Sequence, residues 1–335
     1  MEGIEKDLLG ICIPTYDRSA YLNECLKSVI DEFSPFGFPI YISDNCSTDN
    51  TTNVVSSFEN DYDNIKYVRN NSNLGLYRNI LNVMQMAETR YIWLMGDDDA
   101  IRKGSVEKLL NLLNKNPDFV VLNSSAYDKE LILERVHKVF YCQADRKYDN
   151  GSTKNILNDL KKSPYYGFMS SMVLRRNLLV PLIPKYYDPN FPLFGTAWLP
   201  FAIFYEAIFK GTGYFICDPV VLSRINPRPL ENNDWTYFYL DRFMALAYLK
   251  EVGYSKETLK PLVKAGIIGS ISAGLIAKAD KEDLSLINDY VKYSKLLPIP
   301  IQLTIQMIDL IPNFLVKKMK QVILMLRESR AHSLP

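Results

Sequence analysis

Histidine is scarce in this sequence, which holds only His137 and His332 among 335 residues. A zinc site built on histidines and a serine–histidine catalytic pair are therefore disfavoured. Neither a G-x-G-x-x-G nor a G-x-x-x-x-G-K-[ST] motif is present, which disfavours a dinucleotide-binding site and a P-loop. Any metal must then be held by carboxylates, and that donor set suits Mg²⁺ or Mn²⁺.

An excess of charge is also lacking, because 39 Lys and Arg residues face 38 Asp and Glu residues. No global field draws the chain to nucleic acid, so no nucleic-acid partner is expected.

The cysteines are odd in number and dispersed, without C-x-x-C spacing, which predicts reduced, buried thiols in a cytosolic compartment. They are Cys12, Cys25, Cys46, Cys142 and Cys217. The first residues have no basic, apolar leader pattern, so no signal peptide is expected.

Long apolar runs are few. The run over 265–277 ("AGIIGSISAGLIA") is too short to span a bilayer and predicts a buried helix. The tail from Leu296 mixes apolar stretches with lysines and arginines and is broken by prolines. Such a tail fits a helix lying in the membrane interface. It equally fits an amphipathic helix packed on the protein's own core or on a second copy in a homodimer.

Strand and helix patterns alternate over the first 125 residues. Strand-like runs fall at 8–14, 39–43, 65–69, 91–95 and 119–123, with helical spacing between them. This alternation predicts an α/β fold with a mainly parallel, Rossmann-like sheet and helices on both faces. Ligands bind such sheets beyond the carboxyl ends of the strands. There the prediction brings together "PTYDR", "SDNCSTD" and "GDDD".

The pattern loosens over residues 126–234, which are rich in prolines and aromatics, and becomes helical over residues 235–335. We therefore expect three parts with these boundaries, at 1–125, 126–234 and 235–335.

Three consecutive aspartates, Asp97 to Asp99, follow a buried strand and Gly96. One or two acids could serve to favour the N-terminus of the next helix. Three exceed that need, and a divalent cation that also binds phosphate oxygens is the simplest neutraliser. The cluster therefore predicts metal-assisted departure of a diphosphate.

Four stretches carry a resemblance to a known family: "ICIPTYDRSAYLNECLKSV", "IYISDNCSTDNT", "NNSNLGLYRN" and "YIWLMGDDDAI". In this order they resemble the nucleotide-binding half of the family 2 glycosyltransferases, which have a GT-A fold. The closer likeness is to the bacterial O-antigen subgroup that includes abequosyltransferases. The likeness covers about 8–125 and thins beyond it to "SSMVLRRN" and "GYFICDPVVLSRIN". It implies a nucleotide-sugar-binding half over 1–125 and an acceptor-binding half over 126–234.

The resemblance also implies roles for single residues. Asp44 would bind the base, and Asp97 would contact ribose or sugar. The site for Mn²⁺ or Mg²⁺ would be formed by Asp98 as the ligand and Asp99 beside it. Arg78, at a helix start, is expected to help bind the nucleotide-sugar. The base pocket would be lined by Pro14, Thr15, Tyr16 and Arg18.

The sequence departs from the family pattern in two places. The second strand ends in Ser43-Asp44, which is one carboxylate short of the usual pair. The acidic pair that supplies a catalytic base lies about twelve residues before a glycine in the family, but here that position is Leu199-Pro200. The stereochemical outcome therefore stays open. Substitute bases are Asp188, Glu206 and Asp234, each of which is equally explained as a surface or capping acid.

The resemblance implies a glycosyltransferase that moves a hexosyl or deoxyhexosyl unit from a nucleotide-sugar to a hydroxyl of a lipid-linked oligosaccharide. It would act in surface polysaccharide synthesis, at the inner face of the cell membrane. Trp198 and Trp235 are candidates for stacking on acceptor sugars, or else are core residues. A nucleotidyltransferase is a less favoured alternative, because the first loop lacks glycine and lysine. A non-catalytic nucleotide- or sugar-binding scaffold is the other alternative.

Overall fold

The computed structural model describes residues 4–150, 154–160, 168–196, 198–224, 232–263, 311–312, 314–319 and 321. The chain divides into two compact units. The first comprises Met1–Gly195 and Ile203–Pro227, and the second comprises Thr196–Ala202 and Arg228–Pro335.

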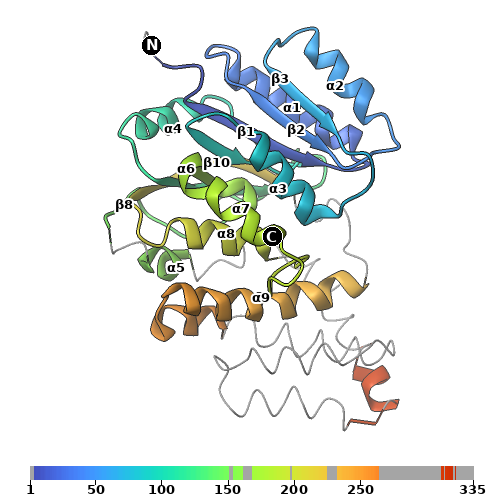
Figure 1. Cartoon of the computed structure of the whole chain (residues 1–335), viewed down its shortest axis with the longest axis vertical. Coiled ribbons are helices and arrows are strands. Elements are labelled where there is room, and N and C mark those ends of the chain that lie inside the picture. Colours follow the sequence, from blue (N-terminus) through green and yellow to red (C-terminus); the bar gives the residue numbers. More distant parts are fainter. Residues whose placement is uncertain are drawn as a thin grey trace. The chain divides into compact units, whose positions relative to one another are not determined.

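In the described part of the first unit, ten strands form one sheet in the order β3-β2-β1-β4-β9-β6-β10-β5, with β7 beside β6 and β8 beside β10. Figure 1 shows β1, β2 and β3 lying side by side. The strands are β1 (Leu9–Thr15), β2 (Ile40–Asp44), β3 (Ile65–Arg69), β4 (Tyr91–Leu94), β5 (Ala100–Ile101), β6 (Phe119–Tyr127), β7 (Glu134–Val136), β8 (Arg146–Tyr148), β9 (Met172–Arg175) and β10 (Gly213–Arg224).

Helices and short 3₁₀ turns lie between these strands, and α9 follows the last of them. They are α1 (Ser19–Phe33), α2 (Thr51–Glu59), α3 (Leu76–Met86), α4 (Val106–Leu113), α5 (Lys154–Leu160), η1 (Met169–Ser171), α6 (Arg176–Leu179), η2 (Val180–Leu182), α7 (Ile183–Tyr187), α8 (Leu199–Ala207) and α9 (Asn232–Val252).

The predicted parallel sheet is confirmed for β1, β2, β3 and β4. Every residue of β1 is buried, as expected for a strand that is covered on both faces. The other half of the sheet is mixed, because β9 enters antiparallel between β4 and β6, whereas β10 runs parallel to β6. The alternation of the first 125 residues could not reveal β9, which comes from a part of the chain without a regular period.

The core of the first unit packs helices onto this sheet. Apolar residues of α1 recur three and four positions apart, which places them on one face of the helix. They are Leu22, Cys25, Leu26, Val29 and Phe33. These residues join the buried side chains of β1, β4 and α4 in one cluster. α3 packs on β1 and β2, so the ends of these strands are supported.

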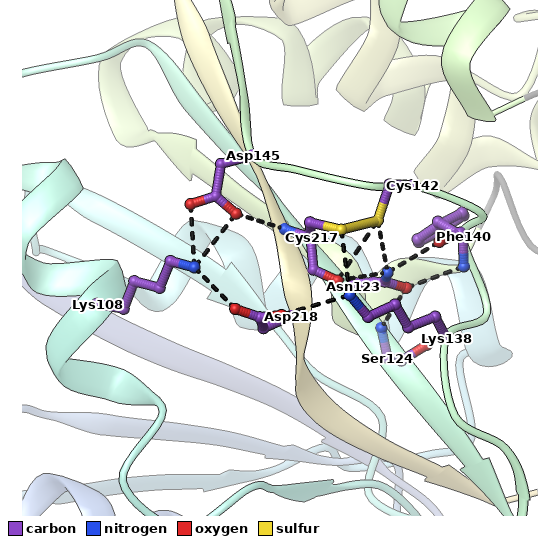
Figure 2. Close-up of a disulfide and its surroundings, with 9 residues drawn as sticks. All are labelled: Lys108, Asn123, Ser124, Lys138, Phe140, Cys142, Asp145, Cys217 and Asp218. Atoms are coloured by element: carbon purple, nitrogen blue, oxygen red, sulfur yellow. Dashed lines mark hydrogen bonds and ion pairs between the residues drawn. A yellow bond between two sulfur atoms is a disulfide. The ribbon is translucent and has the colours of Figure 1, made fainter.

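Cys142 and Cys217 form a disulfide across 75 residues of sequence (Figure 2). The prediction of five reduced thiols is therefore wrong for this pair, while Cys12, Cys25 and Cys46 are free. The pairing depends on tertiary structure. Asn123 of β6 donates to the Phe140 carbonyl at 2.9 Å and to the Cys217 carbonyl at 2.8 Å. It thereby holds the segment that precedes Cys142 against β10.

Little of the predicted C-terminal tail is described. In its described part Phe314 is 64% exposed and Val316 is buried, whereas the run over 265–277 and most of the tail lie outside the described residues. No helix among the residues that the structure describes has both the length and the apolar character needed to cross a membrane.

Candidate functional site at the carboxyl edge of the sheet

The register of the sheet aligns the ends of its first strands. Thr15 of β1 lies beside Asp44 of β2, and Asp44 lies beside Arg69 of β3. β4 ends at the same edge, where the N–H of Met95 donates to the Cys12 carbonyl at 2.9 Å. The loops with "PTYDR", "SDNCSTD" and "GDDD" therefore leave one edge, as predicted.

Hydrogen bonds tie the first two of these loops together. Asp17 has the left-handed backbone conformation, with φ of 48°, and its N–H donates to Ser47 Oγ at 2.9 Å. Its carboxylate accepts the Thr48 N–H at 2.6 Å. On the other side of Arg18, the backbone N–H of Ser19 donates to the carboxylate of Asp49 at 2.8 Å. The backbone on both sides of Arg18 is thus fixed.

Arg18 is the positive partner of the aspartates in this structure. Its Nη1 lies 2.8 Å from Asp97 Oδ1, and its Nη2 lies 2.9 Å from Asp98 Oδ2. The hydroxyl of Thr15 donates to the other oxygen of Asp97 at 2.8 Å. Side-chain exposure is 22% for Arg18, 4% for Asp97 and 18% for Asp98. One guanidinium therefore lies where two carboxylates converge.

The same burial and charges shift the pKa values of these groups. Burial raises the pKa of Asp97 to about 6, an effect that Arg18 opposes and Asp98 reinforces. For Arg18, burial acts to lower the pKa, but Asp97 and Asp98 together raise it above its ordinary value. Arg18 therefore stays charged.

Asp99 lies apart from this contact. Its carboxylate accepts a hydrogen bond from the Ser170 hydroxyl, and its residue is only 4% exposed. Burial raises the pKa of Asp99 well above its ordinary value, and Asp98 raises it further. Ser170 Oγ also accepts the N–H of Gly96 at 2.9 Å, so the turn that carries the aspartates is anchored to η1.

Arg224, at the end of β10, holds the same turn from another direction. Its Nε donates to the Asp98 carbonyl at 2.7 Å, and its Nη1 donates to the Lys129 carbonyl at 2.6 Å. Its Nη2 pairs with the carboxylate of Glu24. With a side chain only 2% exposed, Arg224 is a buried clamp on the backbone of the acidic turn.

Asp44 is completely buried, and both of its oxygens have protein partners. The Ser47 N–H donates to one oxygen at 2.9 Å. The other accepts from the Tyr67 hydroxyl at 2.7 Å and lies 3.5 Å from Arg69 Nε. A base could hydrogen-bond to Asp44 only after Tyr67 or the Ser47 turn gives way.

The remaining predicted nucleotide-sugar residues lie at or near this edge. Pro14 is buried in β1 beside Ser43, whereas Tyr16 is 38% exposed. The guanidinium of Arg78, in α3, lies 4.8 Å from the centre of the Phe194 ring.

Two of the predicted bases, Asp188 and Glu206, have partners other than the three aspartates. The carboxylate of Asp188 is exposed and accepts the Asn190 N–H at 2.8 Å. Glu206 pairs with Lys185 at 2.8 Å and accepts from the Tyr186 hydroxyl at 2.8 Å. The side chains of Asp234 and Trp235 lie outside the described residues.

Trp198 belongs to the second unit and is only 3% exposed. It packs edge-on against Phe201 with ring centres 5.2 Å apart, and the Arg242 guanidinium lies 5.6 Å from its ring centre. These contacts make Trp198 a core residue of that unit, the alternative that the sequence left open.

The donor set at the aspartates suits a divalent cation only in part. Among the described residues, no three Asp, Glu, His or Cys side chains are grouped so that they could surround a metal ion, because Asp99 faces Ser170. Asp97 and Asp98, however, converge on one cation, the Arg18 guanidinium. Two hard oxygen donors completed by phosphate and water oxygens are a usual Mg²⁺ or Mn²⁺ environment.

Sequence reasoning missed three residues of this site: Ser170, Arg224 and Asn79. Ser170 and Arg224 both lie in the two later stretches in which the family resemblance persists, and this was the available signal. Asn79 lies in the "GLYRN" stretch. Its amide accepts from Ser43 Oγ at 2.7 Å and donates to the Ser43 carbonyl at 2.8 Å and the Thr15 carbonyl at 3.3 Å.

The chain resembles characterised proteins in sequence. It is 28% identical over 260 residues to the abequosyltransferase RfbV of Salmonella typhimurium, covering 75% of this chain and 76% of the relative. It is 30% identical over 108 residues to a GalNAc(5)-diNAcBac-PP-undecaprenol beta-1,3-glucosyltransferase of Campylobacter jejuni, covering 32% of this chain and 35% of the relative.

Solved structures share the fold at low identity. TarS 1–349 of S. aureus has a TM-score of 0.66 at 14% identity, over 95% of this chain and 91% of that one. The mannosyltransferase PcManGT of Pyrobaculum calidifontis, in complex with GDP-Man and Mn²⁺, has a TM-score of 0.52 at 14% identity, over 94% and 86%. The model of the family "Glycosyl transferase family 2" matches residues 10–179, which include the ends of β1 to β4 and the three aspartates. The chain therefore belongs to glycosyl transferase family 2, with a GT-A fold.

Proposed function

We propose that this glycosyltransferase moves a hexosyl or deoxyhexosyl unit from a nucleoside-diphosphate sugar to a hydroxyl of a lipid-linked oligosaccharide in surface-glycan synthesis. The observation that carries the donor half is the convergence of Asp97 and Asp98 on one cation at the carboxyl edge. The likeness to an abequosyltransferase and to a glucosyltransferase that acts on an undecaprenol-linked glycan supports the acceptor class and the sugar class.

The donor would lie across the ends of β1, β2 and β4. Tyr16, which is 38% exposed, would contact the base, and Arg18 would pair with the diphosphate. The Thr15 hydroxyl holds the Asp97 carboxylate in one orientation. Asp97 can therefore accept a hydrogen bond from a ribose or sugar hydroxyl at a fixed position. Asp44 would act on the base pocket through Ser47 and Tyr67, and would contact the base itself only if Tyr67 or the Ser47 turn moved away.

Asp98 would hold Mn²⁺ or Mg²⁺ with help from Asp97. When bound, the metal would supply positive charge to the departing diphosphate. Ser170 and Arg224 would keep the turn in place, since they bind its Gly96 N–H and its Asp98 carbonyl. Asp99 would serve this anchoring through Ser170, beside the metal ligand and not as one.

The acceptor would be presented at a membrane surface. The C-terminal tail would lie on the inner face of the membrane. Binding of the purified chain to anionic vesicles tests this placement. A variant lacking residues after 310 is the comparison for that measurement. Binding that is equal in both chains would refute the role of the tail.

The donor half is tested by thermal melting with UDP, GDP, CDP and dTDP, each with and without Mn²⁺. A ligand at a hundredfold excess over its Kd stabilises the folded state by about 2.7 kcal/mol. We expect one nucleotide to raise the melting temperature in a metal-dependent way, and we expect Asp98→Ala to abolish the effect of the metal. Asp61→Asn, at an exposed position, is the matched control.

Release of the nucleoside diphosphate from the corresponding nucleotide-sugar then tests turnover. An enzyme hydrolyses or transfers its donor, whereas a scaffold only binds it. A folded protein that none of the four nucleotides stabilises would refute the donor site. Binding without any turnover would support the scaffold instead.

A further inference from the structure

We propose that Arg18 is the resident counter-ion of Asp97 and Asp98, and that it exchanges these carboxylates for the donor diphosphate when the nucleotide-sugar and its divalent cation bind. This inference rests on the proposed function and deepens it. The site then binds a divalent cation together with a nucleotide diphosphate, and Arg18 excludes the cation when no nucleotide is bound.

The Arg18 guanidinium occupies the position that a cation shared by the two carboxylates would take. Asp97 Oδ1 and Asp98 Oδ2 lie 2.8 Å and 2.9 Å from two nitrogens of Arg18. A cation that bridges the same two oxygens would lie close to the guanidinium, and like charges at such separations repel strongly in a partly buried site. Arg18 and a divalent cation therefore compete for the two carboxylates.

The hydrogen bonding of the Arg18 side chain is incomplete. Its Nε is buried and has no hydrogen-bond partner among the described residues. A buried N–H without a partner costs free energy, and an oxygen of a phosphate can accept from it. Guanidinium groups bind phosphate with two parallel hydrogen bonds. The diphosphate therefore offers Arg18 at least the hydrogen bonding that it has now.

The backbone that carries Arg18 is held in place while its side chain can rotate. Hydrogen bonds from Asp17 and Ser19 to the neighbouring loop hold the backbone on both sides of Arg18. The exchange therefore requires only a rotation of the side chain. Arg18 and Arg224 lie 5.3 Å and 4.9 Å from the centre of the Tyr21 ring. Arg224 cannot take part, because its side chain is buried and holds the Asp98 carbonyl, the Lys129 carbonyl and Glu24.

The test is Mn²⁺ binding without nucleotide, measured from the electron paramagnetic resonance signal of free Mn²⁺. The proteins are the wild type, Arg18→Gln and Arg18→Gln/Asp98→Asn. Arg69→Gln is the matched control, because Arg69 lies at the same edge but pairs with Asp44. We expect Arg18→Gln to bind Mn²⁺ at least tenfold more tightly than the wild type and Arg69→Gln, and we expect the double variant to lose that binding.

A second arm uses the wild type with Mn²⁺ and UDP, GDP, CDP or dTDP. There we expect the nucleotide that stabilises the protein to increase Mn²⁺ affinity at least tenfold. Equally tight Mn²⁺ binding by the wild type with and without nucleotide would overturn the exchange, and so would equal binding by Arg18→Gln and the wild type. The wild-type arm decides the matter if Arg18→Gln does not fold. If no nucleotide stabilises the wild type, the proposed function fails, while Mn²⁺ binding by Arg18→Gln alone still decides the role of Arg18.

Discussion

The hydroxyl of Ser170 accepts the backbone N–H of Gly96 at 2.9 Å, and so joins the turn of the three aspartates to a segment 74 residues further along the chain. The same hydroxyl donates to Asp99. Ser170→Ala leaves a buried N–H and a buried carboxyl group without this partner. We expect a loss of about 2 kcal/mol, which lowers the melting temperature by roughly 5 °C.

Ser171→Ala is the matched control for that change. Ser171 is the next residue of η1 and is also buried, but its hydroxyl has no hydrogen-bond partner among the described residues. Its removal should leave the melting temperature unchanged or slightly raised. Equal losses from both substitutions would show that Ser170 acts by packing and not through Gly96 and Asp99.

Asn79→Ala should destabilise the nucleotide edge. The side-chain amide of Asn79 is buried, and both of its hydrogens are donated to carbonyls. Its oxygen accepts from the Ser43 hydroxyl and from the Asn70 amide, the latter at 2.9 Å. Its loss leaves the Ser43 and Thr15 carbonyls with fewer partners, and we expect a cost of about 3 kcal/mol. Thermal melting measures it, with the exposed Asn53→Ala in α2 as the control. A cost below that of the control would contradict these contacts.

Arg224→Lys should weaken both the fold and donor binding. A lysine is a point charge and cannot span the Asp98 carbonyl, the Lys129 carbonyl and Glu24 at once. We expect a loss of about 3 kcal/mol and a smaller nucleotide-dependent stabilisation, because the turn with Asp98 is released. Glu24→Gln removes only the half-exposed charge and should cost less than about 1 kcal/mol. The reverse order of the two losses would refute the clamp.

The disulfide between Cys142 and Cys217 can be counted chemically. Unfolded, unreduced protein should react with a thiol reagent at three cysteines, and reduced protein at five. A link across 75 residues restricts the unfolded chain and stabilises the fold by about 4 kcal/mol in the chain-entropy account. Reduction should therefore lower the melting temperature by about 8 °C or more. As a control, Cys46→Ser should leave the melting temperature unchanged, and two further thiols should still react after reduction. Five reactive thiols before reduction would contradict the pairing.

Local pattern is enough to predict the first half of the fold. Strand-like runs and helical spacing repeat within short windows, so β1 to β4 and the loops at their carboxyl ends can be placed from sequence. The run Asp97–Asp99 is recognisable as a charge cluster for the same reason. What these residues contact is not a local property. The sequence predicts a divalent cation as their partner, whereas the structure places Arg18, about eighty positions earlier, on Asp97 and Asp98.

The alternating βα units, the carboxyl edge and the acidic turn follow from the amino-acid sequence alone, because residues close along the chain set periodicity and turns. Which strands lie side by side depends on long-range packing in the folded protein. The insertion of β9 beside β4 brings Ser170 to Gly96, and the pairing of β10 with β6 brings Cys217 to Cys142 and Arg224 to the turn. These contacts join residues separated by 74 to 126 positions, and no periodicity within a short window encodes the order of strands in a sheet.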